Sequence, residues 1–358
     1  INGLTLSTGR LEDAKDIIRS FSLYEKDGLI PNMFPGKGQE PLYNTVDASL
    51  WFINAVYNYL LYANSYEALE FVEKEVYKTI KNIIKAYKEG TKFSIKMDEE
   101  DSLINAGSGL DQVTWMDVRV NGIVVTPRHG KPVEINALWY NALKIAGLLK
   151  DKFEKDEKNE YEELAQKVKD SFNKAFWNED GKYLYDVVNH NEKDHSLRPN
   201  QIWAVSLPFT MLDREKEKYI VQKVFEELYT PYGLRSLSRD HKDYHGIYIG
   251  KLFDRDMAYH QGTTWAFPLG GFFTAYCKVN DYSKEAVELV DSLMRDMEDH
   301  IKDQCLGSIA EIFDGDNPYK ARGCYAQAWS VGEMLRVYYE DILGNHKKLK
   351  KVHKDIFI

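Results

Sequence analysis

Apolar and small residues gather around five of the tryptophans, and each of these clusters leads into a stretch with few charges. After a first interval of about 88 residues, the marker tryptophans recur roughly every 62 to 64 residues, which accommodates one helix out, one helix back and two connections. The scarcity of charge predicts helices that are surrounded by other helices. The five segments are 46–60, 134–149, 200–209, 260–277 and 326–339.

Between these segments, apolar positions three and four apart alternate with Lys and Glu, which predicts amphipathic helices with one solvated face. These helices are expected at 11–21, 68–90, 160–176, 214–229 and 283–301. Strand signals are confined to short runs such as 122–127 and 181–188, so any sheet is expected to be minor. Alternating outer and inner helices predict an all-α fold, an (α/α)6 toroid over residues 1–345 whose first pair is represented by a truncated opening at 1–9. Residues 346–358 are then a basic C-terminal tail or solvated helix end.

The overall charge and the cysteine content restrict the partners and the setting. The formal net charge is -9, whereas binding to nucleic acid requires clustered Lys and Arg. No stretch is long and apolar enough to span a membrane, and no secretory signal opens the chain. Cys277, Cys305 and Cys324 are too few and too widely spaced for a disulfide framework. We therefore expect a cytoplasmic protein without nucleic-acid or membrane partners.

Motifs for several other chemistries are missing from the sequence. It contains no HExxH, glycine-rich phosphate loop or GxSxG elbow, so zinc proteolysis, P-loop chemistry and α/β-hydrolase chemistry have no support. His241 and His245 have the i, i+4 spacing of a metal-binding pair, but no third ligand lies nearby in the sequence. A turn with surface histidines is the preferred interpretation, and we expect no metal site.

Two loops ahead of inner helices concentrate carboxylates. The long loop 91–133 contains Trp115 and Asp117, and the second loop, 308–316, places Glu311 between two apolar residues. Polar residues ahead of inner helices should gather at one end of a toroid, where helix N-termini present unpaired N–H groups. One carboxylate from each loop would provide the acid and the base that glycoside hydrolysis needs. The alternative is a solvated acidic loop in which Trp115 is a plug.

Several long motifs carry a resemblance to a known family, and together they cover nearly the whole chain. They are TGRLEDAKDIIRSF, DGLIPNMFP, YNTVDASLWF, TWMD with VTPRHGKPVEINALWYNAL, RPNQIWAVSLP, YHQGTTWAFPLGGF and EIFDGDNPYKARGCYAQAWSVGEMLR. At these motifs the sequence resembles the glucosidase domain of glycogen debranching enzymes, of the archaeal and bacterial amylo-α-1,6-glucosidase type. The resemblance implies a glucoamylase-like (α/α)6 barrel that needs no cofactor. It also implies an α-glucan or oligosaccharide substrate, with glucose released from the α-1,6 branch stubs of a glycogen-like glucan by inversion.

The resemblance also implies roles for individual residues. Asp117 of TWMD is the expected general acid, and Glu311 of EIFDG is the expected general base. Other residues in matching motifs are expected to line the cleft, although a Trp at an inner-helix repeat is about as often core packing as a sugar platform. These residues are Asp47, Trp115, Arg128, Glu134, Asn136, Trp139, His260, Gln261, Trp265, Gln327 and Trp329.

The chain departs from this family pattern at its start. Relatives carry an N-terminal β-rich domain, a Trp-Gly-Arg-Asp segment and the start of the first inner helix ahead of the point where Ile1 stands. The Arg and Asp of that segment are expected to grip the terminal glucose. We therefore expect the chain to be joined to the N-terminal domain of a longer parent chain, and to be impaired when it acts alone.

Two other interpretations stay open. The first keeps the toroid and changes the reaction, giving a trehalase-like glycosidase or a phosphorylase, for which Arg119, Arg128 and Lys131 could supply an anion pocket. The second is a non-catalytic glucan-binding fragment, in which the carboxylates only bind sugar hydroxyls.

Overall fold

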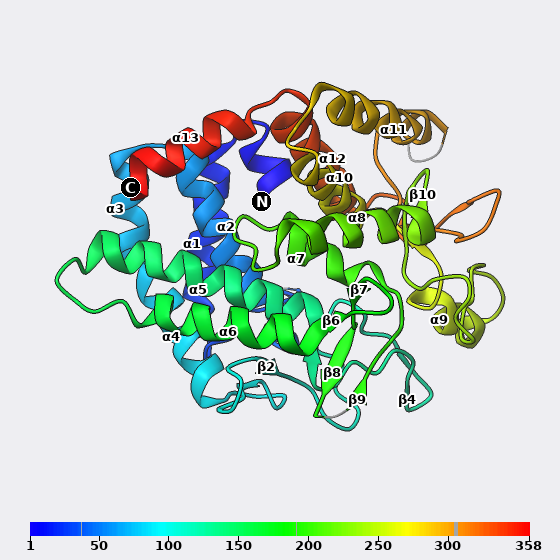
Figure 1. The fold of residues 1–358 in the computed structure, drawn as a ribbon, viewed down its shortest axis with the longest axis horizontal. Coiled ribbons are helices and arrows are strands. Elements are labelled where there is room, and N and C mark those ends of the chain that lie inside the picture. Colours follow the sequence, from blue (N-terminus) through cyan, green and yellow to red (C-terminus); the bar gives the residue numbers. More distant parts are fainter. Residues whose placement is uncertain (37, 191, 304–306) are drawn as a thin grey trace.

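The computed structural model describes residues 1–36, 38–190, 192–303 and 307–358, and most of these residues are helical (Figure 1). The elements of the predicted inner set contact one another in chain order, and α12 also contacts η1. They are η1 (Asn2–Leu6), α2 (Ala48–Ala63), α5 (Val133–Phe153), η3 (Pro199–Ile202) with α7 (Trp203–Ser206), α10 (Phe267–Val279) and α12 (Ala328–Val337).

Small residues let the inner elements approach closely. A Cβ atom on Gly271 of α10 would lie 2.8 Å from the Trp203 ring of α7, and one on Gly270 would lie 2.4 Å from the Glu333 carboxylate of α12. The third inner segment is short because α7 ends at Ser206, two residues before Pro208, which cannot continue a helix. The inner elements are thus apolar on nearly all sides, as their low charge predicts.

The predicted outer segments are also helices, each burying one face. They are α1 (Leu11–Leu23), α3 (Tyr66–Phe71) continuing through η2 (Val72–Val76) into α4 (Tyr77–Glu89), α6 (Glu160–Phe176), α8 (Arg214–Leu228) and α11 (Lys284–Asp303). Side chains cap three of them: Ser65 accepts from the Ala68 N–H, Asn159 from the Glu162 N–H and Asp213 from the Lys216 N–H. These caps explain where the helices begin.

The C-terminal segment is helical as well. After η4 (Tyr338–Ile342), helix α13 (His346–Phe357) runs along one edge of the molecule and contacts α2 and α5 (Figure 1). It buries Val352 and Ile356, and the His353 ring lies 3.0 Å from the Tyr57 hydroxyl. The basic residues of this segment therefore lie on a helix that packs against the body. No helix in the described ranges has the length and apolar character to cross a membrane.

Short antiparallel strands connect the helices, so the fold is mostly helical and not purely α. The small sheets are β1 (Lys96–Met97) with β2 (Ile104–Asn105), β3 (Arg119–Val120) with β4 (Ile123–Val124), β6 (Trp177–Asn178) with β7 (Tyr183–Leu184), and β5 (Lys131–Pro132) with β8 (Val187–Asn189) and β9 (Glu192–Lys193). Strands β4 and β7 fall in the segments 122–127 and 181–188, and β8 begins in the second of these and ends one residue beyond it.

A larger sheet was not expected from the sequence. Its strands pair in the order β10 (Tyr229–Thr230), β11 (Gly233–Arg235), β12 (Thr264–Trp265), β13 (Ile312–Phe313) and β14 (Ala321–Arg322). Helix α9 (Leu252–Tyr259), which leads toward β12, was not predicted either. This sheet brings segments that are far apart in the sequence to one place, and the candidate site lies beside it.

Candidate active site

Glu311 lies directly before β13 and is held by backbone groups. Its N–H donates to the Cys324 carbonyl at 2.8 Å, and the Cys324 N–H donates to Glu311 Oε2 at 2.9 Å. The Gln327 amide donates to the other carboxylate oxygen at 3.4 Å. Gly323 has φ +65°, and a Cβ atom there would lie 2.4 Å from Glu311 Oε2. Because glycine has no Cβ, the carboxylate can occupy this space. The Glu311 carboxylate is therefore fixed by the segment that follows β14 and leads into α12.

Asp117 lies in the loop before β3, and 53% of its side chain is exposed. Its Oδ1 lies 3.8 Å from Nε2 of His260. Two residues earlier, Trp115 is oriented by a hydrogen bond of 2.7 Å from its Nε1 to Oδ1 of Asn200. The Trp115 ring meets the rings of His260 and Trp265 edge to face, with centroids 5.4 Å and 5.1 Å apart. The aromatic cluster thus positions the Asp117 loop.

The two acidic loops converge on one place. Trp265 of β12 pairs with Ile312 of β13, which directly follows Glu311. The His260 ring stacks on Trp265 with centroids 4.8 Å apart, and it faces Asp117. Burial raises the pKa of the Tyr259 hydroxyl, and the Glu311 and Asp117 carboxylates raise it further. Both carboxylates therefore act on the same pair of side chains at the C-terminal end of α9.

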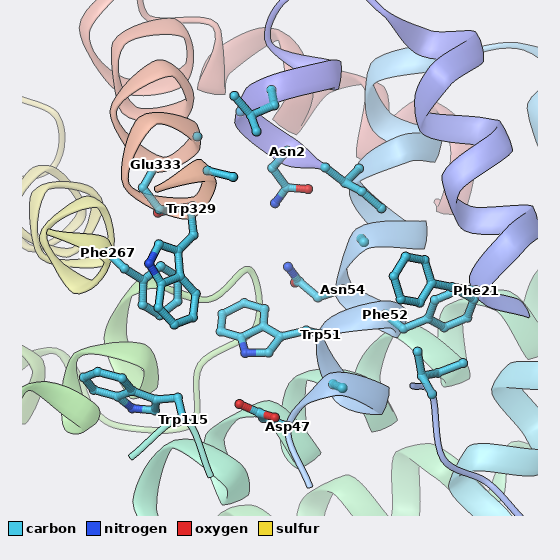
Figure 2. A pocket seen from close by; sticks show the side chains of 18 of the residues that line it. Asn2, Phe21, Asp47, Trp51, Phe52, Asn54, Trp115, Phe267, Trp329 and Glu333 are labelled. Atoms are coloured by element: carbon cyan, nitrogen blue, oxygen red, sulfur yellow. The ribbon is translucent and has the colours of Figure 1, made fainter. Parts of the chain in front are cut away.

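A cavity of about 510 Å³ opens between the inner elements next to Trp115 (Figure 2). Aromatic rings from α2, α7, α10 and α12 line it, and the carboxylates of Asp47, Glu134 and Glu333 are its acidic groups. Figure 2 shows Asp47 and Trp115 at one end of this space and Asn2 with Glu333 at the other. Asp117 and Glu311 are not in its lining, but Trp115, two residues before Asp117, is.

The raised pKa of Asp47 is the main electrostatic feature of the cavity. Asp47 directly precedes α2. Burial is the largest cause, and the Glu134 and Asp117 carboxylates add to it, raising the pKa of Asp47 to about 7. A carboxyl group that is half protonated near neutral pH can both donate to and accept from a sugar hydroxyl.

A buried network of charges lies behind the cavity. Arg128 donates to both oxygens of Asp186 at 2.7 and 3.1 Å and forms a two-pronged ion pair with Glu134. Asp186 also accepts from the Asn200 amide at 2.7 Å, and Asn200 holds Trp115. Arg128, Glu134 and Asp186 are each buried. The ion pairs therefore extend from the cavity wall to the aromatic ring beside Asp117.

Asp186, Arg198 and Asn200 were not among the residues expected from the sequence. Arg198 donates to the carbonyls of His260 and Ser236 at 2.7 and 3.0 Å and to the Gln261 side chain at 2.6 Å. Arg198 and Asn200 stand in the RPNQIW motif ahead of the third inner helix, which repeats the pattern of a polar residue before a Trp. That pattern is the signal that could have found them.

The expected cleft residues separate into three groups. The cavity lining includes four of them, Asp47, Trp115, Glu134 and Trp329. A second group lies behind the carboxylates, where Arg128, His260, Gln261, Trp265 and Gln327 hold other side chains. The third group, Asn136 and Trp139, is fully buried in the core.

Asn136 and Trp139 have no surface that faces the cavity. The Asn136 amide bridges the backbone of Ile104 and Pro132, and Trp139 donates to the Ser102 carbonyl at 3.2 Å while its ring stacks on Tyr87. Both residues therefore tie α5 to the loop before it. The expectation that they contact sugar does not agree with this burial. These two residues fit the motif because they pack in the core.

Of the described cysteines, Cys324 contributes its backbone to the site, where its N–H and carbonyl hold Glu311. Cys277 is buried in α10 and Cys324 is exposed, while Cys305 lies outside the described residues. Within the described ranges, no group of three or more His, Cys, Asp and Glu side chains could hold a metal ion.

Comparisons with known proteins agree with the resemblance seen in the motifs. The family model described as amylo-alpha-1,6-glucosidase matches residues 1–336. The glycogen debranching enzyme of Saccharomyces cerevisiae is 25% identical over 438 residues, which cover 95% of this chain and 28% of that protein. The chain thus spans less than a third of the curated relative that it matches.

Solved structures of glycosidases share the fold at low sequence identity. The GH63 mannosylglycerate hydrolase from Thermus thermophilus, in complex with glucose, superposes with a TM-score of 0.65 at 13% identity, covering 94% of this chain and 91% of that one. A rhamnosidase from Klebsiella oxytoca with rhamnose bound gives a TM-score of 0.56 at 16% identity, covering 93% and 57%.

Proposed function

Because the chain belongs to the amylo-alpha-1,6-glucosidase family, we propose that it is a glycoside hydrolase that releases glucose from the α-1,6 branch stubs of a glycogen-like glucan. Asp117 is the general acid and Glu311 the general base. The observation that supports this assignment is the convergence of their two loops: Asp117 faces the His260 ring, which stacks on Trp265, and Trp265 pairs with Ile312, the residue after Glu311. The inner elements that meet in chain order form an (α/α)6 toroid over residues 1–345, followed by the basic segment 346–358.

The reaction follows from the two environments. The Asp117 carboxyl gives its proton to the glycosidic oxygen as the C–O bond breaks. The Glu311 carboxylate takes a proton from a water molecule that attacks the anomeric carbon from the opposite face, so the configuration inverts. The backbone N–H of Cys324 holds one Glu311 oxygen, which keeps the base aimed at that water.

The cavity provides the contacts for the sugar. Trp115 and Trp329 offer ring faces to pyranose C–H surfaces, and Asp47 offers a hydroxyl partner. Glu134 is committed to Arg128 and shapes the wall. The same arrangement would serve a catalytic domain that lies in a longer parent chain.

Removal of either carboxylate tests the mechanism. Glucose release from a limit dextrin is measured for Asp117→Asn and Glu311→Gln, in this chain and in its complete gene product. Each change should reduce kcat by on the order of 10² to 10⁴. Asp180→Asn, an exposed carboxylate in the β6–β7 turn, is the matched control. Full activity of either site variant would remove that residue from the mechanism.

The phosphorylase alternative has less support from the charges. Arg128 is paired with Glu134 and Asp186, and Lys131 with Asp98 and Asp101. These two cations are therefore not free to bind phosphate. Arg119, the third candidate, is exposed and donates to the Leu110 carbonyl at 3.4 Å, so it is the cation of the three that stays available. Sugar release that requires added phosphate would favour the phosphorylase. Binding of maltooligosaccharide without turnover by the complete gene product would favour a glucan-binding module.

A further inference from the structure

The His260 ring is fully buried and fixed on three sides by aromatic rings. It follows the last residue of α9 and stacks on Trp265 with an interplanar angle of 13°. Trp115 meets it at 86°, and the Tyr259 ring lies 4.9 Å away at 62°. With 0% of its surface exposed, the ring cannot contact a sugar directly.

The ring nitrogens of His260 have no hydrogen-bond partner among the described residues. A buried polar atom without a partner costs free energy, so such an atom calls for an explanation. For Nε2 the explanation is its neighbour. Asp117 Oδ1 lies 3.8 Å away, which is too long for a hydrogen bond and short enough for one to form by a small movement of the exposed Asp117 side chain.

The charges around the ring favour a neutral imidazole with its proton on Nε2. Burial lowers the pKa of His260, and the Arg198 guanidinium lowers it as well, while Asp117 and Glu311 oppose this shift. Within the described ranges, Asp117 is the carboxylate within 4 Å of a His260 nitrogen. A lone pair on Nε2 would repel that carboxylate, whereas an N–H would attract it.

We infer that His260 is a positioning residue for the general acid: its Nε2–H meets the Asp117 carboxylate that forms when Asp117 gives its proton to the glycosidic oxygen. This inference depends on the proposed function. The His260 proton stays on the ring throughout, and the only proton that moves to the leaving oxygen is that of Asp117. Arg198 fixes the backbone for this role, because its Nη1 donates to the His260 carbonyl.

The test uses two substrates that differ in their need for an acid. An α-1,6-linked glucoside needs protonation of its leaving oxygen, whereas fluoride departs from α-glucosyl fluoride without that proton. His260→Phe keeps an aromatic ring against Trp265 and removes both nitrogens. We expect its kcat on the α-1,6 substrate to fall roughly 10-fold to 100-fold, a part of what a general acid contributes, with a much smaller loss on the fluoride.

A second pair of variants covers the case in which His260→Phe does not fold. The His260→Gln amide can reach the position of Nε2, whereas His260→Asn is one methylene shorter. We expect Gln to retain more activity than Asn on the α-1,6 substrate, with equal activity of the two on the fluoride. Equal losses on both substrates, or no difference between Gln and Asn, would overturn the inference. Asp117→Asn separates the two proposals: if that variant is fully active, the proposed function itself is wrong.

Discussion

The two carboxylates of the proposed active site are held in opposite ways. Glu311 directly precedes a strand of the five-stranded sheet, with the Cys324 N–H on one oxygen and the Gln327 amide on the other. Asp117 stands in a loop, with 53% of its side chain exposed and the His260 ring 3.8 Å away. The base is thus preorganised by backbone geometry, whereas the acid depends on the side chains behind its loop.

This difference agrees with the tasks of the two groups. A general base must hold a water molecule in one place, and rigid hydrogen bonds from the backbone do this well. A general acid must change its charge during the reaction and approach an oxygen that belongs to a large substrate. The groups that orient Asp117 are therefore expected to be side chains behind its loop, namely the aromatic cluster and the buried ion pairs.

Among changes that leave both carboxylates in place, the largest effect on kcat should come from crowding the base. In Gly323→Ala the new methyl group would lie 2.4 Å from Glu311 Oε2 and must displace the carboxylate. A displacement of about 1 Å at a reacting group costs on the order of 100-fold in rate. We therefore expect kcat for glucose release to fall by about that factor, with little change in KM.

Gly122→Ala is the matched control on the acid side. Gly122 also has a positive φ, +76°, but no atom lies within 4 Å of its Cβ position. It stands in the β3–β4 turn, soon after Asp117. Backbone strain is then similar in the two variants, and only Gly323→Ala moves a carboxylate. Similar losses of kcat in both variants would contradict the view that the base is the rigidly fixed group.

The next effect should come from the ion pairs behind the acid. Asp186→Asn would leave Arg128 with one carboxylate and would turn an amide donor toward either Arg128 or Asn200. Breaking a buried ion pair by removing one partner costs roughly 3 to 5 kcal/mol. We expect the free energy of unfolding, measured by urea denaturation, to fall by about that amount.

Glu179→Gln provides the comparison, because its ion pair with Lys182 is exposed. Water screens exposed ion pairs, so the free energy of unfolding of this variant should hardly change. Where Asp186→Asn still folds, its kcat should also fall, since Asn200 would lose a bond of 2.7 Å and would hold Trp115 less firmly. Normal stability in Asp186→Asn would show that these ion pairs do not support the acid loop.

The sequence predicted the helices better than it predicted the site. The charge-poor segments around Trp203, Trp265 and Trp329 each overlap an inner helix, as predicted. A helix surrounded by other helices needs apolar residues on all sides, so its low charge is visible in the sequence. The five-stranded sheet escaped prediction because strands such as Thr264–Trp265 and Ile312–Phe313 have two residues each. Two residues cannot display an alternation of period two.

Motif matching placed residues in the right region without separating their tasks. Asp47 and Trp329 line the cavity, whereas Trp139, which heads an equivalent repeat, is part of the core. Sequence periodicity reports which side of a helix is buried and cannot tell a ring against protein from a ring against a cavity. Asp186 lies between two short strands, and nothing in the sequence around it indicates a role in the site. Only the fold brings its carboxylate to Arg128 and Asn200.

The smallest effect concerns Asp47, which stands near the acid. Its pKa in the folded chain is about 7, above the ordinary value of 3.8. Between these values the folded chain binds more protons than the unfolded chain, so Asp47 makes stability fall as pH rises toward 7 and has no further effect above it. Asp47→Asn removes this fall. Between pH 4 and 7, the free energy of unfolding of the variant should therefore rise relative to that of the parent chain. The total rise is at most about 4 kcal/mol, and it is smaller if cavity water solvates the carboxylate.

Asp213→Asn gives the opposite sign in the same measurement. The Lys216 N–H at the start of α8 is the main cause that lowers the pKa of Asp213, so this carboxylate stabilises the fold above its ordinary pKa and the stabilisation is lost in acid. The difference in the free energy of unfolding, variant minus parent, is measured by urea denaturation at several pH values. As pH increases, this difference should rise for Asp47→Asn and fall for Asp213→Asn. If the free energy of unfolding of Asp47→Asn instead runs parallel to that of the parent chain across this pH range, Asp47 is well solvated. The acid side of the site would then resemble an open loop, and the contrast with Glu311 would rest on hydrogen bonding alone.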